Sequence, residues 1–197
     1  MDTRQRLRAE LKQRRTEHSA QECTVSSLQI CEHIRRDRLF HARKRFALYY
    51  PVGNEVNLMP LLHIAWSFRK ETYLPVLATF PKGYLWWVPY YDHTPLYLNK
   101  FQIPEPRHNA RDRTTRIRSL DVIFMPLVGF DKNGNRMGMG GGFYDRSLAK
   151  CYRSASSWHR PLKIGVAYSW QEVDKLPSEK WDIPLDAIVT ENGLTWF

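Results

Sequence analysis

The sequence has few cysteines and no long apolar segment. Its three cysteines, Cys23, Cys31 and Cys151, are an odd number without the spacing of a metal site. They predict free thiols, and we therefore expect a cytoplasmic protein. No apolar stretch approaches the roughly 18 residues that a membrane-spanning helix needs. The Arg-rich N-terminus also has no apolar core of a secretory signal behind it, so we expect no role at a membrane.

Acidic residues are scarce relative to basic ones. The 197 residues include 30 Lys and Arg against 20 Asp and Glu, which gives a net charge of +10. Such a balance is typical of nucleic-acid-binding proteins, and that function stays open as an alternative. However, the basic residues are scattered, and no helix-turn-helix, zinc-finger or RNA-recognition signature accompanies them. An anionic small-molecule ligand explains part of the excess. The seven histidines lack the spacing of a metal cluster or a nucleophilic relay.

The hydrophobic pattern predicts one α/β domain over residues 1–197. Hydrophobic residues make up 43% of the chain, which argues against disorder. Short apolar runs that predict strands alternate with helical patterns, which predicts an open, largely parallel, twisted sheet with helices on both faces in a Rossmann-like three-layer arrangement. We expect strands at 46–50, 72–77, 84–88, 120–127, 163–168 and 187–190, and helices at 3–17, 19–38, 57–68 and 144–152. The polar, proline-punctuated segment 92–119 gives no clear assignment.

Glycine is concentrated in one place. Of the ten glycines, Gly138, Gly140, Gly141 and Gly142 fall within five positions, between an apolar strand and a predicted helix. A glycine-rich turn that enters a helix directs several backbone N–H groups at one spot, which is how proteins bind phosphate groups. The loop therefore predicts a polyphosphate site at the carboxyl end of the sheet, where ligands of such folds bind. The alternative is an exposed turn without a ligand.

Four ordered segments resemble one enzyme family. They are the loop segment 129–146, the motif Arg4-x-x-x-Arg8 with Leu7, the segment 50–55, and Ile103-Pro-Glu-Pro. Together they are similar to the 5-formyltetrahydrofolate cyclo-ligases, also called methenyltetrahydrofolate synthetases. The resemblance implies an ATP- and Mg²⁺-dependent conversion of 5-formyltetrahydrofolate to 5,10-methenyltetrahydrofolate, with release of ADP and phosphate. It also implies a folate that can carry a polyglutamate tail. We expect a monomer.

The resemblance assigns the nucleotide site to two segments. The implied ATP-binding residues are Arg4, Gln5, Arg6, Leu7, Arg8, Arg136, Met137, Gly138, Met139, Gly140, Gly141, Gly142, Phe143 and Tyr144. Arginine suits this role because a guanidinium grips phosphate oxygens bidentately and stays charged near neutral pH. For the stripe Arg4, Arg8 and Lys12, an exposed helix face is the alternative reading.

The remaining implied residues divide into three groups. Asp145 follows the glycine loop and is the expected Mg²⁺ ligand, with Asp182 as the second carboxylate and Asp186 as an alternative to it. For Asp145 the competing reading is a helix-terminus carboxylate. The expected catalytic residues are Arg136, Asp145 and Arg146. The expected folate-binding residues are Tyr50, Glu55, Phe101, Met139, Gly140, Gly141, Gly142 and Phe143.

The glycine loop differs from that of some family members and also from a dinucleotide-binding loop. Some family members carry a basic residue inside the loop, where this chain has Met139 and Gly141. The side chain that neutralises the transferred phosphoryl group is therefore left open between neighbouring arginines such as Arg136 and Arg146. A dinucleotide-dependent oxidoreductase is a rival, but the loop lacks the Gly-x-Gly-x-x-Gly spacing and the acidic residue that should follow a second strand.

Overall fold

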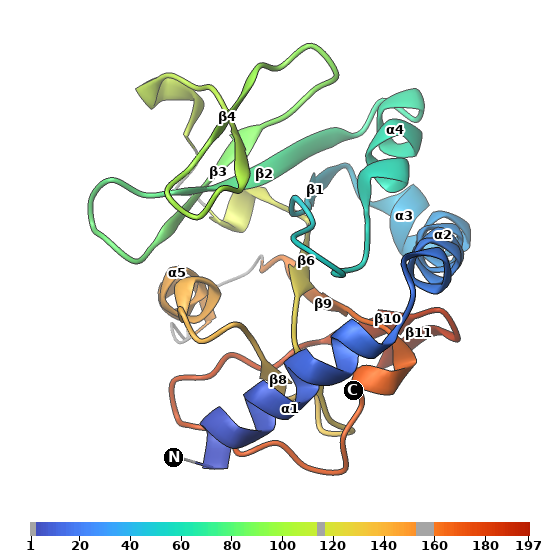
Figure 1. The fold of residues 1–197 in the computed structure, drawn as a ribbon. Coiled ribbons are helices and arrows are strands. Elements are labelled where there is room, and N and C mark those ends of the chain that lie inside the picture. The colour runs from blue at the N-terminus through green and yellow to red at the C-terminus, as the bar shows by residue number, and fades with distance from the viewer. Residues whose placement is uncertain (1–2, 114–116, 153–159) are drawn as a thin grey trace.

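A seven-stranded sheet forms the centre of the molecule. A computed structural model describes residues 3–113, 117–152 and 160–197. The strands of this sheet lie in the order β11-β10-β9-β6-β1-β2-β3, as Figure 1 shows in part. Their bounds are β1 Arg45–Ala47, β2 Glu71–Leu77, β3 Leu85–Pro89, β6 Val122–Pro126, β9 Leu162–Val166, β10 Ala187–Thr190 and β11 Gly193–Trp196. Two small sheets pair β4 Leu96–Leu98 with β5 Pro104–Pro106, and β7 Gly129–Phe130 with β8 Arg136–Met137.

The five inner strands are parallel, and the two edge strands are antiparallel. Strand β1 pairs in parallel with both β2 and β6, and the series continues in parallel through β9 to β10. Strands β3 and β11 close the two edges in antiparallel pairs. The prediction of a largely parallel α/β sheet is confirmed. From β1 the chain adds β2 on one side and later β6 on the other, so the order reverses between β1 and β6, where such folds bind ligands.

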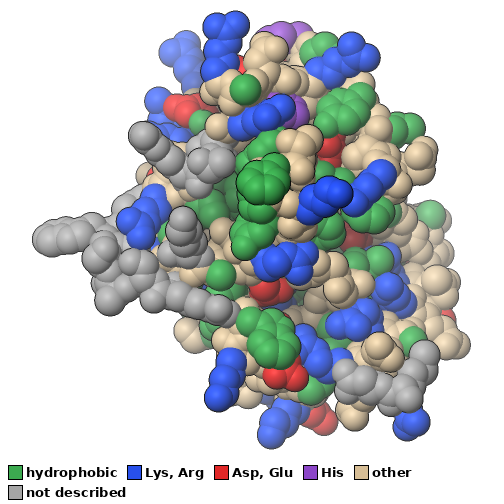
Figure 2. Space-filling view, turned by 90° about the vertical axis from the view of Figure 1, so that its left-hand side faces the viewer, with side chains coloured by type: hydrophobic (Ala, Val, Ile, Leu, Met, Phe, Trp, Pro, Cys, Tyr) green, Lys and Arg blue, Asp and Glu red, His purple; other side chains and the backbone are tan. Residues whose placement is uncertain are grey.

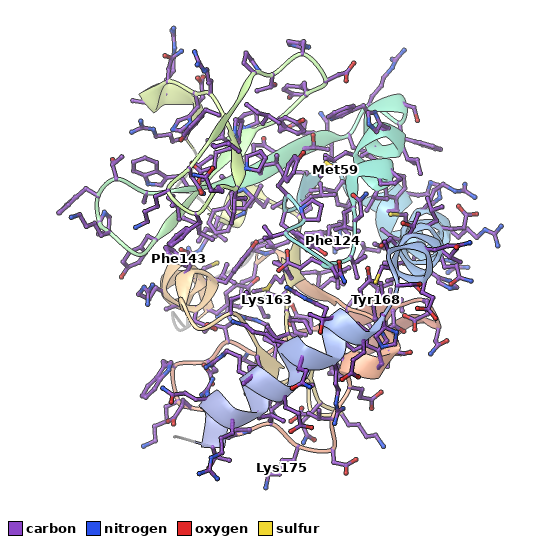
Figure 3. The ribbon with its side chains drawn as sticks, in the orientation of Figure 1. Met59, Phe124, Phe143, Lys163, Tyr168 and Lys175 are labelled. Atoms are coloured by element: carbon purple, nitrogen blue, oxygen red, sulfur yellow. The ribbon has the colours of Figure 1, made fainter. Side chains whose placement is uncertain are left out.

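Helices cover both faces of the sheet. The helices are α1 Thr3–Glu17, α2 Ala20–Arg36, α3 Arg38–Ala42, α4 Met59–Ser67 and α5 Phe143–Tyr152, with 3₁₀ turns at Ala110–Asp112, Ile117–Ser119 and Ser169–Gln171. One core cluster joins α2, α3 and α4 to side chains such as Phe124 (Figure 3). A second cluster joins α5, through Leu148, to Ile123 and Met125 on the opposite face. Alternate side chains of β6 thus enter opposite layers, as a doubly covered strand requires.

Helix α1 belongs to neither of these layers. Its buried Leu11 packs with Val128, Met137 and Leu176 in a third cluster, and it lies across β8 in Figure 1. A Cβ on Gly129 would lie 2.6 Å from Leu11 Cδ1, so the helix and the chain after β6 are in close contact. This packing holds α1 against the chain that leaves the carboxyl end of β6.

The helix boundaries agree with the sequence at one point and differ from it at two. Ser19 and Glu22 have the spacing of a capping box, and the structure confirms that Ser19 caps α2 through this reciprocal contact. Asn57 does not cap α4, because Leu58 is the N-cap; the Asn57 side chain instead accepts from the Met59 N–H at 2.9 Å. The predicted helix 19–38 is divided at Asp37, which ends α2 and caps α3.

The structure also bears on the predicted thiols and the expected lack of a membrane role. Cys23, Cys31 and Cys151 are free cysteines, as predicted. Burial raises the pKa of the Cys31 thiol to about 11. In the part of the chain with described coordinates, no helix has the length and apolar character needed to span a membrane. A single domain over residues 1–197 stays a prediction.

Candidate nucleotide and folate site

The glycine loop, residues 138–142, lies against helix α1. Arg8 Nε donates a hydrogen bond to the Gly138 carbonyl at 3.0 Å. Gly140 and Gly142 have φ angles of +100° and +62°, in the left-handed region that favours glycine. A Cβ on Gly140 would lie 3.6 Å from the guanidinium carbon of Arg8. The N-terminal arginine segment and the loop, distant in sequence, therefore form one surface.

A pocket of about 560 Å³ opens between α1, the glycine loop and α5. We call it the arginine pocket. Four arginines line it, together with three carboxylates: Arg4, Arg8, Arg136, Arg146, Asp145, Glu179 and Asp182. Figure 2 shows the side of the molecule that is at the left in Figure 1, where α5 lies; basic side chains extend over this face, and acidic ones are few. A pocket with this lining is suited to a polyanion whose charge is partly balanced by a cation.

Two ion pairs fix two of the three carboxylates of the pocket. Arg136 Nη2 lies 2.7 Å from Asp145 Oδ1, and Arg4 Nη1 lies 2.8 Å from Asp182 Oδ2. Asp145 Oδ1 also accepts from the Ile183 N–H at 3.1 Å. Burial lowers the pKa of the Arg136 guanidinium, and the charge of Asp145 opposes that shift. Arg136 lines the pocket, and its Nε is buried without a hydrogen-bond partner.

Arg146 connects the glycine loop to a second loop. Its Nε donates to the Gly83 carbonyl at 2.9 Å, and its Nη2 donates to the Gly141 carbonyl. Gly83 lies between β2 and β3, so this one side chain joins the β2–β3 connection to the loop before α5. As the guanidinium also lines the arginine pocket, Arg146 both shapes the loop and presents charge to the pocket.

Phe143 connects the loop to the β4–β5 hairpin. It is the first residue of α5 and is labelled in Figure 3. Its ring meets the ring of Phe101 edge-on, with centroids 6.1 Å apart, and Phe101 itself is 51% exposed. Buried Glu105 holds this hairpin to β2, because its Oε1 accepts from the Leu77 N–H at 2.9 Å. An exposed aromatic ring is thereby fixed beside the pocket.

Glu55 lies in the loop after β1, at the point where the strand order reverses. Its side chain is 10% exposed, and burial raises its pKa. Burial raises the pKa of Tyr49 and of Tyr144, and the charge of Glu55 adds to both shifts. Tyr144 also lines the arginine pocket. Arg15 Nη1 lies 3.6 Å from Glu55 Oε1, so the loop after β1 contacts α1, the helix that also lines the pocket.

The structure brings most of the predicted nucleotide residues together. Ten of them line the arginine pocket: Arg4, Gln5, Arg8, Arg136, Gly138, Met139, Gly140, Gly142, Phe143 and Tyr144. The remaining four lie outside its lining. Arg6 is exposed, Leu7 packs against the Leu11 cluster, Met137 is buried, and Gly141 bonds Arg146 through its carbonyl. Of the predicted folate residues, Tyr50, Glu55 and Phe101 lie outside this pocket, on its neighbouring loops.

Sequence reasoning missed some lining residues and left one alternative open. Glu179 and Trp181 line the pocket, and their proximity to Asp182 in the sequence was the available signal. Asp186, the alternative to Asp182, lies 2.7 Å from Lys163 Nζ and is not part of the pocket lining. Lys163 lies in β9 and not in the loops around the pocket (Figure 3).

The donor set of the pocket is compatible with Mg²⁺. Asp145 and Asp182 supply carboxylate oxygens, and Mg²⁺ in phosphate sites is typically held by one or two carboxylates plus substrate oxygens. Within the described ranges, no group of three or more His, Cys, Asp or Glu side chains could hold a metal by itself. The residues therefore fit a metal that arrives with a polyphosphate.

Comparison with known proteins agrees with this geometry. The chain matches the model of the 5-formyltetrahydrofolate cyclo-ligase family over residues 1–191. It is 37% identical to the 5-formyltetrahydrofolate cyclo-ligase of Haemophilus influenzae over 184 residues, which covers 92% of this chain and 94% of the relative. It is 40% identical to the Escherichia coli enzyme of the same name over 146 residues, or 73% of this chain and 76% of the relative.

Solved structures give the same result. The NMR structure of Aquifex aeolicus 5,10-methenyltetrahydrofolate synthetase superimposes with a TM-score of 0.83 and 31% identity, covering 99% of this chain and 93% of the other. The fold is shared as well by the Mycoplasma pneumoniae synthetase, with a TM-score of 0.71 and 23% identity over 96% and 99% of the two chains. The chain therefore belongs to the 5-formyltetrahydrofolate cyclo-ligase family.

Proposed function

We propose that this protein uses ATP to convert 5-formyltetrahydrofolate to 5,10-methenyltetrahydrofolate. The observation that carries the proposal is the arginine pocket, in which α1 and the glycine loop are joined by Arg8 and Gly138. The loop of Glu55 contacts the same helix, since Arg15 Nη1 lies 3.6 Å from Glu55 Oε1. These two features support a polyphosphate site in the arginine pocket and a pterin contact at Glu55.

The proposed reaction has two steps. The formyl oxygen attacks the γ-phosphorus of ATP and ADP leaves, which gives an iminium phosphate at N5. N10 then attacks the activated carbon, loses its proton, and the ring closes as phosphate departs with the former formyl oxygen. Phosphorylation is needed because an amide carbon is a poor electrophile. No covalent bond to the enzyme is needed, so the protein contributes placement and charge neutralisation.

We assign the nucleotide to the arginine pocket. Arg4, Arg8 and Arg136 would bind the phosphates, and the α5 N-terminus adds the positive end of its dipole. Arg136 and Arg146 are the arginines nearest the loop in sequence, and we propose that they neutralise the transferred phosphoryl group. When ATP binds, its phosphates would compete with Asp145 and Asp182 for their arginine partners.

We also propose that Asp145 and Asp182 hold Mg²⁺. The ion, when bound, supplies positive charge that offsets the phosphate oxygens of ATP. The exchange of partners described above would free carboxylate oxygens for it. The polyglutamate tail, the monomeric state and the cytoplasmic location stay predictions.

We assign the folate to the loops beside the pocket. An ionised Glu55 can accept hydrogen bonds from the amino group and the adjacent N–H of a pterin, while Tyr50 and the exposed ring of Phe101 provide packing surfaces. Gly140, Gly141, Gly142 and Phe143, with Met139, would line the boundary between the two substrates.

Phosphate release tests the assignment. We expect phosphate to appear from Mg-ATP only when 5-formyltetrahydrofolate is present, because the formyl oxygen is the attacking group. Release at the same rate without the folate would indicate a simple ATPase, and no release with both would contradict the proposal. A gel-shift titration with nucleic acid tests the alternative suggested by the net charge.

A further inference from the structure

Arg15, near the C-terminal end of α1, is buried against the loop after β1. Its side chain is 13% exposed, and its Nη1 lies 3.6 Å from Glu55 Oε1. The loop also contacts the Arg15 backbone, because Asn54 Nδ2 donates to the Arg15 carbonyl at 3.1 Å. By contrast, its neighbour Arg14 is 43% exposed and forms a helix-surface pair with Glu10. Of these two adjacent arginines, only Arg15 points toward the loop after β1.

The buried position of Arg15 requires a compensating negative charge, which Glu55 supplies. Arg15 Nη1 is buried and has no hydrogen-bond partner. A buried cation is costly unless a nearby opposite charge compensates it. Glu55 is the carboxylate that forms an ion pair with it. The two charges therefore depend on each other for their burial.

The other groups that face Glu55 cannot replace Arg15. The Val52 N–H donates to Glu55 Oε2 at 3.0 Å, but it is neutral. Tyr49, after β1, and Tyr144, from α5, are the titratable groups that interact with the charge of Glu55, and burial and that charge together raise the pKa of both phenols. The Tyr49 hydroxyl donates to the Val56 carbonyl at 2.9 Å. Both phenols stay neutral near pH 7. Burial raises the pKa of the Glu55 carboxyl group, and Arg15 is the cation that opposes this shift.

We propose that Arg15 is a positioning residue for folate binding, which keeps the Glu55 carboxylate charged and oriented. This inference rests on the proposed role of Glu55 toward the folate. A charged carboxylate accepts hydrogen bonds from two pterin donors, whereas its protonated form presents a donor of its own. Arg4, Arg8 and Arg15 all lie on α1, so the helix that contacts the nucleotide pocket also sets the state of the folate loop.

The dependence of folate use on pH tests this inference. In Arg15→Gln, loss of the cation raises the pKa of Glu55, so the carboxylate becomes protonated at a higher pH. We expect the acidic limb of kcat/KM for 5-formyltetrahydrofolate, which reports the free enzyme, to move up by about one pH unit. Arg15→Lys keeps the charge, so its acidic limb should lie close to that of the wild type. The KM for ATP should stay near that of the wild type in both variants.

Arg14→Gln is the matched control, since it removes the adjacent but exposed charge and should leave the limb in place. Arg15→Met, which keeps an unbranched stem, replaces Arg15→Gln if that variant does not fold. Calorimetric titration of 5-formyltetrahydrofolate at each pH provides a readout that does not depend on turnover. The enzyme-free cyclisation rate is subtracted at every pH.

Two results distinguish the positioning role of Arg15 from the folate-binding role of Glu55. In the first, Glu55→Gln weakens folate binding, but the acidic limb of kcat/KM lies at the same pH in Arg15→Gln as in Arg14→Gln. This result would overturn the positioning role of Arg15 and leave Glu55 as a folate ligand. If Glu55→Gln leaves folate binding unchanged, the assigned role of Glu55 fails, and the inference about Arg15 fails with it.

Discussion

Arg136 and Asp145 form an ion pair of 2.7 Å in which the arginine side chain is only 5% exposed. Arg136 lies in β8, before the glycine loop, and Asp145 lies in the first turn of α5, after it. The pair thus closes the loop at its base. Asp145 also accepts from the Ile183 N–H, so the same carboxylate fixes the segment that carries Asp182.

Asp145→Asn should reduce both stability and turnover. From the sequence, this change is nearly isosteric and should affect metal binding and turnover far more than folding. The structure adds a cost, because the buried Arg136 loses its counter-charge; removing one partner of a buried pair costs about 3–5 kcal/mol. Thermal unfolding and kcat at limiting Mg²⁺ measure the two effects. Asp182→Asn is the control for stability, since both side chains of the Arg4–Asp182 pair are 18% exposed. A variant as stable as the wild type would mean that Arg136 is not held by this pair.

Gly140→Ala should impair the use of ATP more than Gly138→Ala. Gly140 has a φ of +100°, which strains any residue with a Cβ, and the added methyl group would lie 3.6 Å from the Arg8 guanidinium. Gly138 does not have a positive φ, and a Cβ there would lie 3.9 Å from Arg136 Nη1, an ordinary contact. The KM for ATP of the two variants is the comparison. Equal values would reduce the loop to a surface turn.

Arg8→Gln should raise the KM for ATP while leaving the folate KM nearly unchanged. The change removes a cation from the pocket and the bond from Nε to the Gly138 carbonyl. A hydrogen bond to a charged group contributes about 1.5–3 kcal/mol, which corresponds to roughly a 10- to 150-fold loss of affinity. Arg6→Gln should cause a smaller loss, because Arg6 is exposed and lies outside the pocket lining. An equal loss of ATP affinity in both variants would mean that the total positive charge of α1, and not the position of Arg8, determines binding.

Glu55→Gln should weaken folate binding selectively. The amide replaces one acceptor by a donor, which then faces a pterin donor. The lost charge-assisted bond and the unpaired donor together cost about 2–4 kcal/mol. The measurement is the folate KM at saturating ATP, with Glu10→Gln on the exposed face of α1 as the control. Folate affinity equal to that of the control would remove Glu55 from the site.

The sequence predicted the parts of the fold that local patterns determine. The inner strands follow from their apolar runs, and the N-terminus of α2 follows from Ser19 and Glu22. The β4–β5 hairpin in the segment 92–119 was not predicted. Its strands are three residues long and β5 is Pro-Glu-Pro, and a buried Glu105 holds them to β2. Such pairing depends on a tertiary contact, which no local pattern reveals.

The candidate site shows the same division. The glycine loop and Arg8 could be identified because their residue types and spacing are distinctive. Arg15 could not, because in the sequence it is one of several arginines in a basic helix, and only the structure shows that it is buried beside Glu55. The pairing of Asp186 with Lys163 likewise depends on how β9 and the residue before β10 lie together.

The most direct test of the central claim is to mix the protein with Mg-ATP and 5-formyltetrahydrofolate and record the absorbance of the methenyl product. We expect that product accumulates catalytically, that phosphate is released in equal amount, and that omission of either substrate abolishes both signals. Phosphate release without methenyl product, or no product at saturating concentrations of both substrates, would contradict it.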